Sequence, residues 1–101
     1  MIPDDTEQKV LQWAMKRGLF ENSTAWDQAT KLIEEQTELL TAIHRDQRGV
    51  VIDSIGDMMV VLTMIAHFYD VDLQHCYNYA YLQIKDRTGK MVDGVFVKDD
   101  E

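Results

Sequence analysis

The sequence contains little cysteine, few basic residues and no long apolar run. Cys76 is the single cysteine among 101 residues, which excludes a framework of internal disulfides and is typical of a reducing compartment, so we expect a cytoplasmic location. The longest apolar stretch, residues 58–66, is much shorter than the roughly 20 residues that cross a bilayer, so we expect no membrane span. The sequence also lacks a P-loop, a G-x-G-x-x-G fingerprint and a G-x-S-x-G elbow, so none of these enzyme signatures applies.

Acidic residues clearly outnumber basic ones. The chain has 18 Asp and Glu against 10 Lys and Arg, which gives a net charge of −8. Because phosphate groups repel carboxylates, this balance argues against a protein whose main role is to bind polymeric nucleic acid or an anionic membrane. The position of the excess carboxylates therefore becomes the informative question.

The hydrophobic pattern predicts one mostly helical domain over residues 1–101. The expected helices span about residues 4–17, 24–46, 50–69 and 73–87, and a β-hairpin around Asp93-Gly94 spans about 91–98. We expect a loop over residues 19–23, a cap at Asn22 or Ser23, a helix break at Gly49 and a cap at Asp72. Four helices with short connections predict an all-α, four-helix bundle.

A chain of this size buries little surface alone, and the helix over residues 50–69 is apolar on nearly every side. We therefore expect a homo-oligomer, a homodimer or a homotetramer, in which a second subunit covers part of that helix.

Carboxylates border the apolar surface of the two central helices. At about 100° per residue, the helix over 24–46 carries one polar stripe beside its apolar stripe, formed by Gln28, Lys31, Glu35 and Glu38. In the next helix, Asp53 and Asp57 lie at i and i+4 on one face of apolar surroundings.

Two unpaired carboxylates on an apolar face carry a large desolvation cost, so Asp53 and Asp57 require a cation, a basic partner or raised pKa values. A hard divalent cation such as Mg²⁺ takes oxygen ligands and commonly one or two carboxylates together with substrate phosphates. The alternative is a solvated charged face on the first of these helices and Asp side chains that reach solvent or pair with Lys or Arg.

The string Lys31-Leu32-Ile33-Glu34-Glu35-Gln36-Thr37-Glu38-Leu39, followed after a gap by Ile55-Gly56-Asp57, resembles the all-α nucleotide pyrophosphohydrolases of MazG type. Their signature is E-E-x-x-E, then E-x-x-D, and the resemblance covers about residues 8–90. Residues 84–91 and 94–98 look like the C-terminal part of the short MazG-like proteins common in bacteriophages. There is one departure: Ser54 stands where the family has the second-motif Glu, and Asp53 lies beside it.

The resemblance implies a Mg²⁺-dependent hydrolysis of a nucleoside triphosphate to a monophosphate and pyrophosphate, with Mn²⁺ as a substitute metal. Carried over by position, the implied metal ligands are Glu35, Glu38 and Asp57, with Asp53 as a stand-in for the missing Glu. Glu34 is implied as a further ligand or as the base that orients water. The resemblance also implies basic residues against the phosphates, a role that Lys31 matches and that Lys85 and Arg87 could share. The spacing on the last helix adds Asn78 and Tyr81 to Lys85 as a possible contact set for the substrate, and the polar stripe adds Gln28.

Alternatives remain at this stage for several of these residues. Tyr81 and Lys85 on the last helix either contact the nucleotide or serve as core packing and a solvated cation. Trp13 and Trp26 either stack on a base or pack in the interior. A second interpretation of the whole chain, favoured by Ser54, is a catalytically reduced bundle that binds nucleotides or a protein partner in a regulatory role.

Overall fold

The computed structural model describes residues 4–99. The chain begins with α1 (Thr6–Lys16), where Asp4 Oδ1 accepts hydrogen bonds from the Thr6 amide at 2.9 Å and the Thr6 hydroxyl at 2.6 Å. Gly18 ends this helix with a left-handed φ of +69°. A short helix, α2 (Leu19–Asn22), then occupies the segment expected as a loop. It places the Phe20 ring 4.4 Å from His67 and 5.2 Å from Phe68, so packing against the end of α4 accompanies the extra turn.

The first long helix, α3 (Ala25–His44), begins one to two residues later than expected because Thr24, and not Asn22 or Ser23, is its cap. Thr24 Oγ1 accepts the Asp27 amide while the Asp27 carboxylate accepts the Thr24 amide, both at 3.1 Å. This reciprocal pair is a capping box, in which both orphan amides at the helix start are satisfied.

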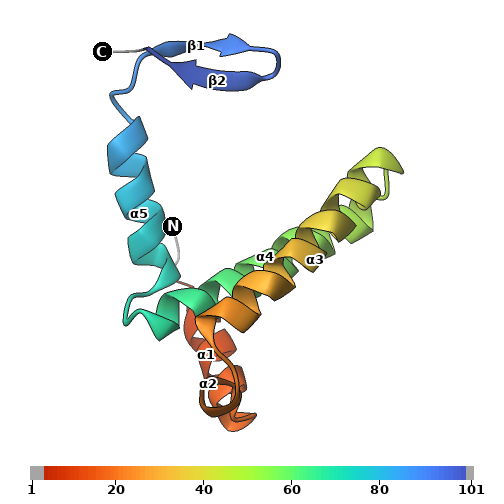
Figure 1. Ribbon diagram of the computed structural model, residues 1–101, viewed down its shortest axis with the longest axis vertical. Helices are drawn as coiled ribbons and strands as arrows, with labels where there is room; N and C mark the ends of the chain where they lie inside the picture. Colours follow the sequence, from red (N-terminus) through yellow and green to blue (C-terminus); the bar gives the residue numbers. More distant parts are fainter. Residues whose placement is uncertain (1–3, 100–101) are drawn as a thin grey trace.

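The second long helix, α4 (Arg48–Phe68), includes Gly49, so the predicted break at Gly49 is wrong. The chain turns instead at Asp46, whose φ is +52°, and Gln47. An Asp tolerates this left-handed geometry better than most residues, which explains why the turn needs no glycine. α3 and α4 then run antiparallel along most of their lengths (Figure 1).

The interior of the chain is small. Among residues 4–99, five apolar residues are buried, at the contacts of α1, α3 and α4: Ala14, Ala42, Val61, Met64 and Ala66. Two of the larger apolar side chains of α4, Ile52 and Ile55, are at least half exposed. The core therefore lies along one side of α4 and leaves another side of this helix uncovered.

The C-terminal part confirms the predicted hairpin. Asp72 caps α5 (Leu73–Ile84) by accepting the His75 amide at 2.7 Å. Antiparallel strands β1 (Gly89–Val92) and β2 (Val95–Lys98) follow, and Gly89 lies opposite Lys98. Both turn residues, Asp93 and Gly94, have positive φ, as a tight two-residue hairpin turn requires.

The mostly helical fold with a C-terminal hairpin is thus as expected, but one chain does not form a closed four-helix bundle. Figure 1 shows α5 leading away from the α3–α4 pair, with the hairpin at its far end. No residue of α5 or of the hairpin is buried in the described part of the chain.

Within residues 4–99, α4 is long and apolar enough to cross a membrane by length and composition alone. The core helix of a soluble protein meets the same criteria. The expectation that the chain has no membrane span therefore stays a prediction.

Candidate metal centre

Three carboxylates meet between the two long helices. Glu35 and Glu38 come from α3, where the i, i+3 spacing places them side by side, and Asp57 comes from the antiparallel α4. One oxygen from each of the three lies within 4.8 Å of the other two. This separation fits three ligands around one cation, and without a cation it places three negative charges in one small volume.

Glu35 is the buried member of the three. Its side chain is 8% exposed, and its Oε1 lies 3.6 Å from the Lys31 ammonium. Its Oε2 is buried and has no hydrogen-bond partner. A buried carboxylate oxygen normally carries a compensating bond, because leaving it unpaired costs its full desolvation penalty. The position of Glu35 is therefore explained only if a further positive or donor group joins the cluster.

The charge of Asp57 is disfavoured by its surroundings. Partial burial raises the pKa of this carboxyl above its usual value, and the nearby charges of Asp53 and Glu35 raise it further, while Lys31 acts in the opposite direction. Burial and neighbouring negative charge are thus the two causes of the raised pKa. A bound cation would offset both, because it replaces the lost water as a partner of the carboxylate and supplies the opposite charge.

Lys31 is the cation at the edge of the cluster. Its Nζ lies 3.2 Å from Glu34 Oε2 and 3.6 Å from Glu35 Oε1. The hydrogen bond to Glu34 and the charges of both glutamates raise the pKa of Lys31, which therefore stays protonated. Glu34 pairs with Lys31 on the outer side and is not among the three clustered carboxylates.

A cavity of about 390 Å³ opens beside the cluster. Its polar lining consists of Gln28, Lys31, Glu35 and Asp57, and Trp13 closes part of its wall. Leu19, Val60, Val61 and Met64 complete the lining. Gln28 donates a hydrogen bond from Nε2 to Ser23 Oγ at 3.0 Å, which ties the first turn of α3 to the preceding loop.

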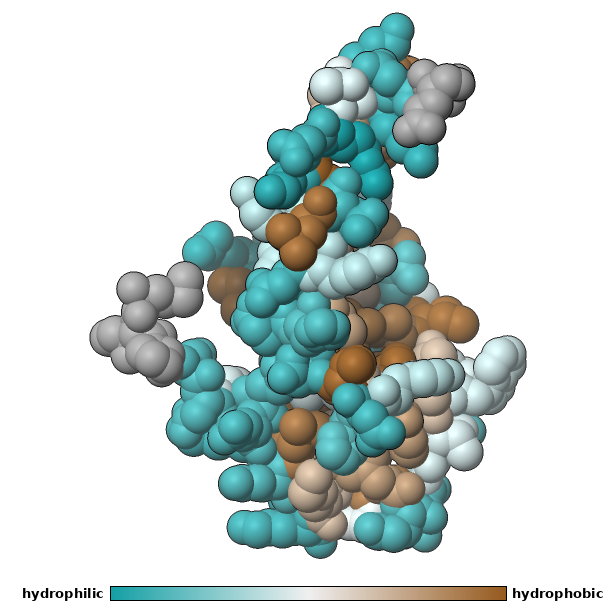
Figure 2. Space-filling model, turned by 90° about the vertical axis from the view of Figure 1, so that its left-hand side faces the viewer, coloured by the Kyte–Doolittle hydropathy of each residue, from teal (hydrophilic) through white to brown (hydrophobic). Residues whose placement is uncertain are grey.

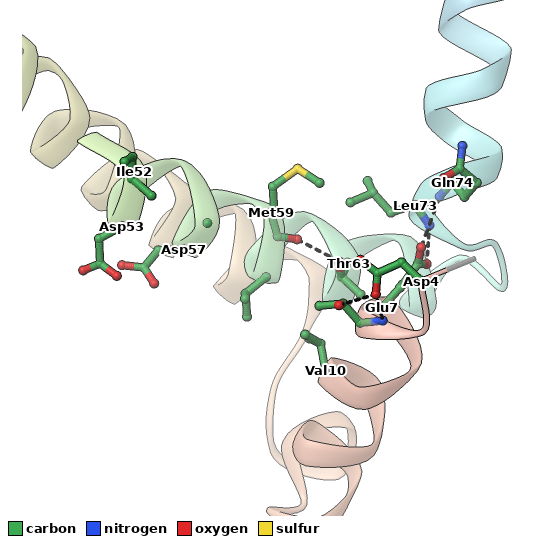
Figure 3. A pocket seen from close by; sticks show the side chains of 13 residues that line it. Asp4, Glu7, Val10, Ile52, Asp53, Asp57, Met59, Thr63, Leu73 and Gln74 are labelled. Atoms are coloured by element: carbon green, nitrogen blue, oxygen red, sulfur yellow. Dashed lines mark hydrogen bonds between the residues drawn. The ribbon is translucent and has the colours of Figure 1, made fainter. Parts of the chain in front are cut away.

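Ser54, which stands where the MazG motif has a Glu, differs from its neighbour Asp53 in burial. Ser54 is 2% exposed and belongs to the interior, whereas the neighbouring Asp53 is exposed. Figure 3 shows Asp53 and Asp57 on the same side of α4, one turn apart. Asp53 lies near enough to raise the pKa of Asp57, but it is outside the group of three clustered carboxylates. A site with three carboxylates is the arrangement that the described residues provide.

A second cavity of about 600 Å³ adjoins Asp53 and Asp57 and extends to the start of α5. Residues Asp4, Thr6 and Glu7 around the start of α1 contribute to its wall (Figure 3). The sequence reasoning missed these three residues, because nothing in their local pattern indicates that α1 crosses α4 beside the carboxylates.

Four expected substrate-binding residues lie elsewhere in the chain: Asn78, Tyr81, Lys85 and Arg87. Asn78 and Tyr81 belong to α5, and Lys85 and Arg87 follow it, in the segment that leads away from α3 and α4 (Figure 1). None of the four lines the cavities described above. One chain therefore brings Gln28 and Lys31 to the carboxylates, but not the residues of α5.

No protein-family model and no solved structure matches the chain. A curated relative, "Uncharacterized 18.2 kDa protein in rep-hol intergenic region" from Haemophilus phage HP1, is 41% identical over 61 residues. The match covers 60% of this chain and 37% of the phage protein, so the chain corresponds to little more than a third of that relative's length. The relative's name states no activity.

Proposed function

We propose that the protein is a divalent-metal-dependent nucleoside triphosphate pyrophosphohydrolase, which cleaves NTP or dNTP between the α and β phosphates to give a monophosphate and pyrophosphate. One observation carries the proposal: a buried, unpartnered oxygen of Glu35 lies in a cluster with Glu38 and Asp57. The resemblance of the same residues to the MazG motifs supports the choice of reaction.

The residues present fit a hard cation. Glu35, Glu38 and Asp57 would hold Mg²⁺ or Mn²⁺, which prefer oxygen ligands and carboxylates. When bound, the metal supplies positive charge for the phosphate oxygens and lowers the pKa of a coordinated water.

The chain's own residues have separate tasks in this proposal. Lys31, held protonated by its two glutamates, presents a positive charge to a phosphate at the mouth of the cavity. Glu34 accepts a hydrogen bond from Lys31 and so orients it, and this carboxylate is the base proposed to orient the attacking water. The apolar wall that includes Val60 and Met64 limits the access of other water molecules.

We take the chain to be a MazG-type unit that completes its four-helix bundle in a homodimer or homotetramer. The exposed apolar side chains of α4 and α5 support this part of the proposal.

The test is a pyrophosphate-release screen over all canonical NTPs and dNTPs, with Mg²⁺, with Mn²⁺ and with EDTA. We expect turnover of at least one nucleotide that depends on the metal. Glu38→Gln and Asp57→Asn should each reduce turnover by at least about 100-fold while the helical circular dichroism is retained, because each removes a negative ligand. Glu21→Gln, the same chemical change at an exposed position of α2, should retain parental turnover. Metal-dependent turnover that survives both cluster variants would show that the site is elsewhere.

A regulatory nucleotide-binding bundle is the second candidate, and it is favoured by the interior position of Ser54, which leaves three carboxylates in the cluster. It predicts nucleotide binding in calorimetry, with Mg²⁺ present, without release of pyrophosphate over hours. Rapid pyrophosphate release at the same nucleotide concentration rules this candidate out.

A further inference from the structure

The C-terminal segment, residues 73–99, projects from the rest of the molecule, and we call it the arm. It comprises α5, β1 and β2, and most of its large apolar side chains are exposed, among them Tyr77, Tyr81, Ile84 and Phe96. An isolated two-stranded hairpin is at best marginally stable in water. The arm therefore needs a surface to pack against.

The direction of the arm is fixed at its base. The Glu7 carboxylate of α1 accepts the backbone amides of Leu73 at 2.6 Å and Gln74 at 3.3 Å, at the first turn of α5 (Figure 3). These contacts join residues that are 66 and 67 positions apart in the sequence. The direction in which α5 leaves the body is therefore set by tertiary structure. The arm is held away from the α3–α4 pair of its own chain.

The exposed area of the chain matches what a stable dimer buries. A compact monomer of 11.7 kDa exposes about 5,900 Å², whereas this chain exposes 8461 Å². The excess is roughly 2,600 Å² per chain, or about 5,000 Å² for two chains, which lies at the upper end of obligate homodimer interfaces. The radius of gyration, 16.2 Å, also exceeds the roughly 13 Å expected of a compact domain of this length.

The α3–α4 pair carries an exposed apolar surface, whose edge on α4 borders the cavity beside Asp53 and Asp57. We call it the platform, and its members are all at least 47% exposed: Ile33, Leu40, Ile43, Ile52, Ile55 and Met59. Figure 3 shows Ile52 and Met59 on the side of α4 opposite Asp53 and Asp57. On α3, Ile33 and Leu40 lie roughly 140–160° around the helix from Glu38, so this part of the platform faces away from that carboxylate. Figure 2 shows apolar side chains reaching the surface both on the lower body and along the arm.

The arm and the platform match in length and differ in charge. The apolar stripe of α5, from Leu73 through Tyr77 and Tyr81 to Ile84, is about 17 Å long, and the platform on α3, from Ile33 to Ile43, is about 15 Å long. Residues 4–72 carry 13 acidic and six basic side chains, whereas residues 73–101 carry five acidic and four basic ones. Two bodies with a strong negative charge repel each other, but a C-terminal segment whose charges nearly balance adds little to that repulsion.

We infer that the arm of one chain packs across the platform of a second copy of the same chain, and that the exchange is reciprocal. Because each copy offers one arm and one platform, a two-fold arrangement satisfies both contacts and closes without leaving a free surface for further addition. The inference does not rest on the proposed hydrolase activity, and its test measures mass and cross-linking without reading turnover.

The first experiment is sedimentation equilibrium of the full chain at micromolar concentration, in which we expect a dimer or an even-numbered assembly. Ile84→Glu in the arm and Ile52→Glu in the platform should each weaken dimerisation by at least about 100-fold, because each buries an unpaired carboxylate. Gln83→Glu adds the same charge to α5 about 100° away from Ile84, outside the apolar stripe, and should change the dissociation constant less than about threefold.

The second experiment keeps the inference testable where a charged variant fails to fold. Two populations are prepared in a Cys76→Ser background, one with Ile84→Cys and the other, enlarged by a mass tag, with Ile52→Cys. After mixing and treatment with a short bis-maleimide, we expect a covalent product whose mass is the sum of one tagged and one untagged chain.

Three results would overturn the inference. The first is a folded monomer at all concentrations tested. The second is a dimer in which Ile84→Cys cross-links only to its own kind. The third is a monomer that floats with phosphatidylcholine vesicles, since the apolar surfaces would then serve a lipid bilayer.

Discussion

The α3–α4 pair and the arm differ in where their groups find partners. Between α3 and α4 the chain buries a carboxylate, Glu35, and leaves one of its oxygens unpaired. Along the arm the chain leaves large apolar side chains such as Tyr81 and Phe96 in water and buries none of them. Both arrangements are unfavourable for an isolated chain, but for opposite reasons: one lacks a positive charge and the other lacks a nonpolar surface.

The α3–α4 pair and the arm therefore require different kinds of partner. A cation of small volume suffices for three carboxylates that are already within 4.8 Å of one another. The arm requires an extended surface about as long as α5. Within one molecule the proposed metal centre already has three carboxylates in place, whereas the contact proposed for the arm needs a second molecule.

The largest expected difference between the two regions is in hydrogen exchange. When the protein is diluted below its dimer dissociation constant, we expect amides of the arm to exchange at least about 100-fold faster than those of the α3–α4 pair, because their hydrogen bonds lose the cover that protects them. At concentrations well above that constant, the difference should shrink. Mass-spectrometric exchange on peptides from residues 25–68 and 73–99 measures both conditions, and equal, concentration-independent protection of the two regions would remove the contrast.

Metal binding should stabilise the α3–α4 pair strongly. Free Mg²⁺ or Mn²⁺ at 100 times its dissociation constant adds about 2.7 kcal/mol to the free energy of unfolding, which in a domain of this size raises the Tm by roughly 10–20 °C. Thermal unfolding with and without EDTA measures the shift. Asp57→Asn serves as the control, because it removes a ligand and should abolish most of the response. A parent protein whose Tm does not respond to either metal would contradict the metal centre.

The start of α3 is determined locally, so its loss should have a moderate effect that does not depend on assembly. Thr24→Ala removes the hydroxyl that accepts the Asp27 amide and should lower stability by about 1 kcal/mol, or by about 4–8 °C in Tm. Thr24→Ser retains a hydroxyl cap and should lie close to the parent. Chemical denaturation measured at two protein concentrations checks that the loss is the same at both, and a loss that varies with concentration would link α3 to the dimer contact.

The sequence was sufficient for features that rest on local interactions. The hairpin follows from Asp93-Gly94, whose positive φ angles select a tight turn, and the cap of α5 follows from the side chain of Asp72. The pairing of Glu35 and Glu38 with Asp57 followed from helical spacing and from the motif resemblance, because antiparallel neighbours joined by a short turn bring their centres together.

The sequence was insufficient where long-range packing decides the outcome. Gly49 indicated a helix break, but the turn lies at Asp46, and α4 continues through the glycine. The projection of α5 from the body depends on Glu7, which is 66 residues away from Leu73, and no local pattern reports such a contact. For the same reason the sequence could not show that Asn78 and Lys85, which we predicted to bind the substrate, lie apart from the carboxylate cluster within one chain.

The smallest expected effect is a change in the stability of the metal-free protein on Asp57→Asn. It reports the electrostatic cost of the carboxylate cluster separately from metal binding. Because the folded-state pKa of Asp57 is raised above its usual value of 3.8, the folded protein binds this proton more tightly than the unfolded chain does. The group therefore lowers stability as the pH rises above about 3.8, and Asp57→Asn should be slightly more stable than the parent at pH 7 without metal. Below that pH both forms are uncharged at this position and the difference should vanish.

Thermal unfolding in EDTA from pH 3 to pH 7 measures this pH dependence. Salt provides the control, since 1 M NaCl screens the repulsion from Asp53 and Glu35 and should reduce the advantage of the variant at pH 7. With Mg²⁺ present the order should reverse, because the carboxylate that destabilises the metal-free cluster then serves as a ligand. A variant that is less stable than the parent in EDTA at pH 7 would show that Asp57 is held by an interaction that does not need a metal.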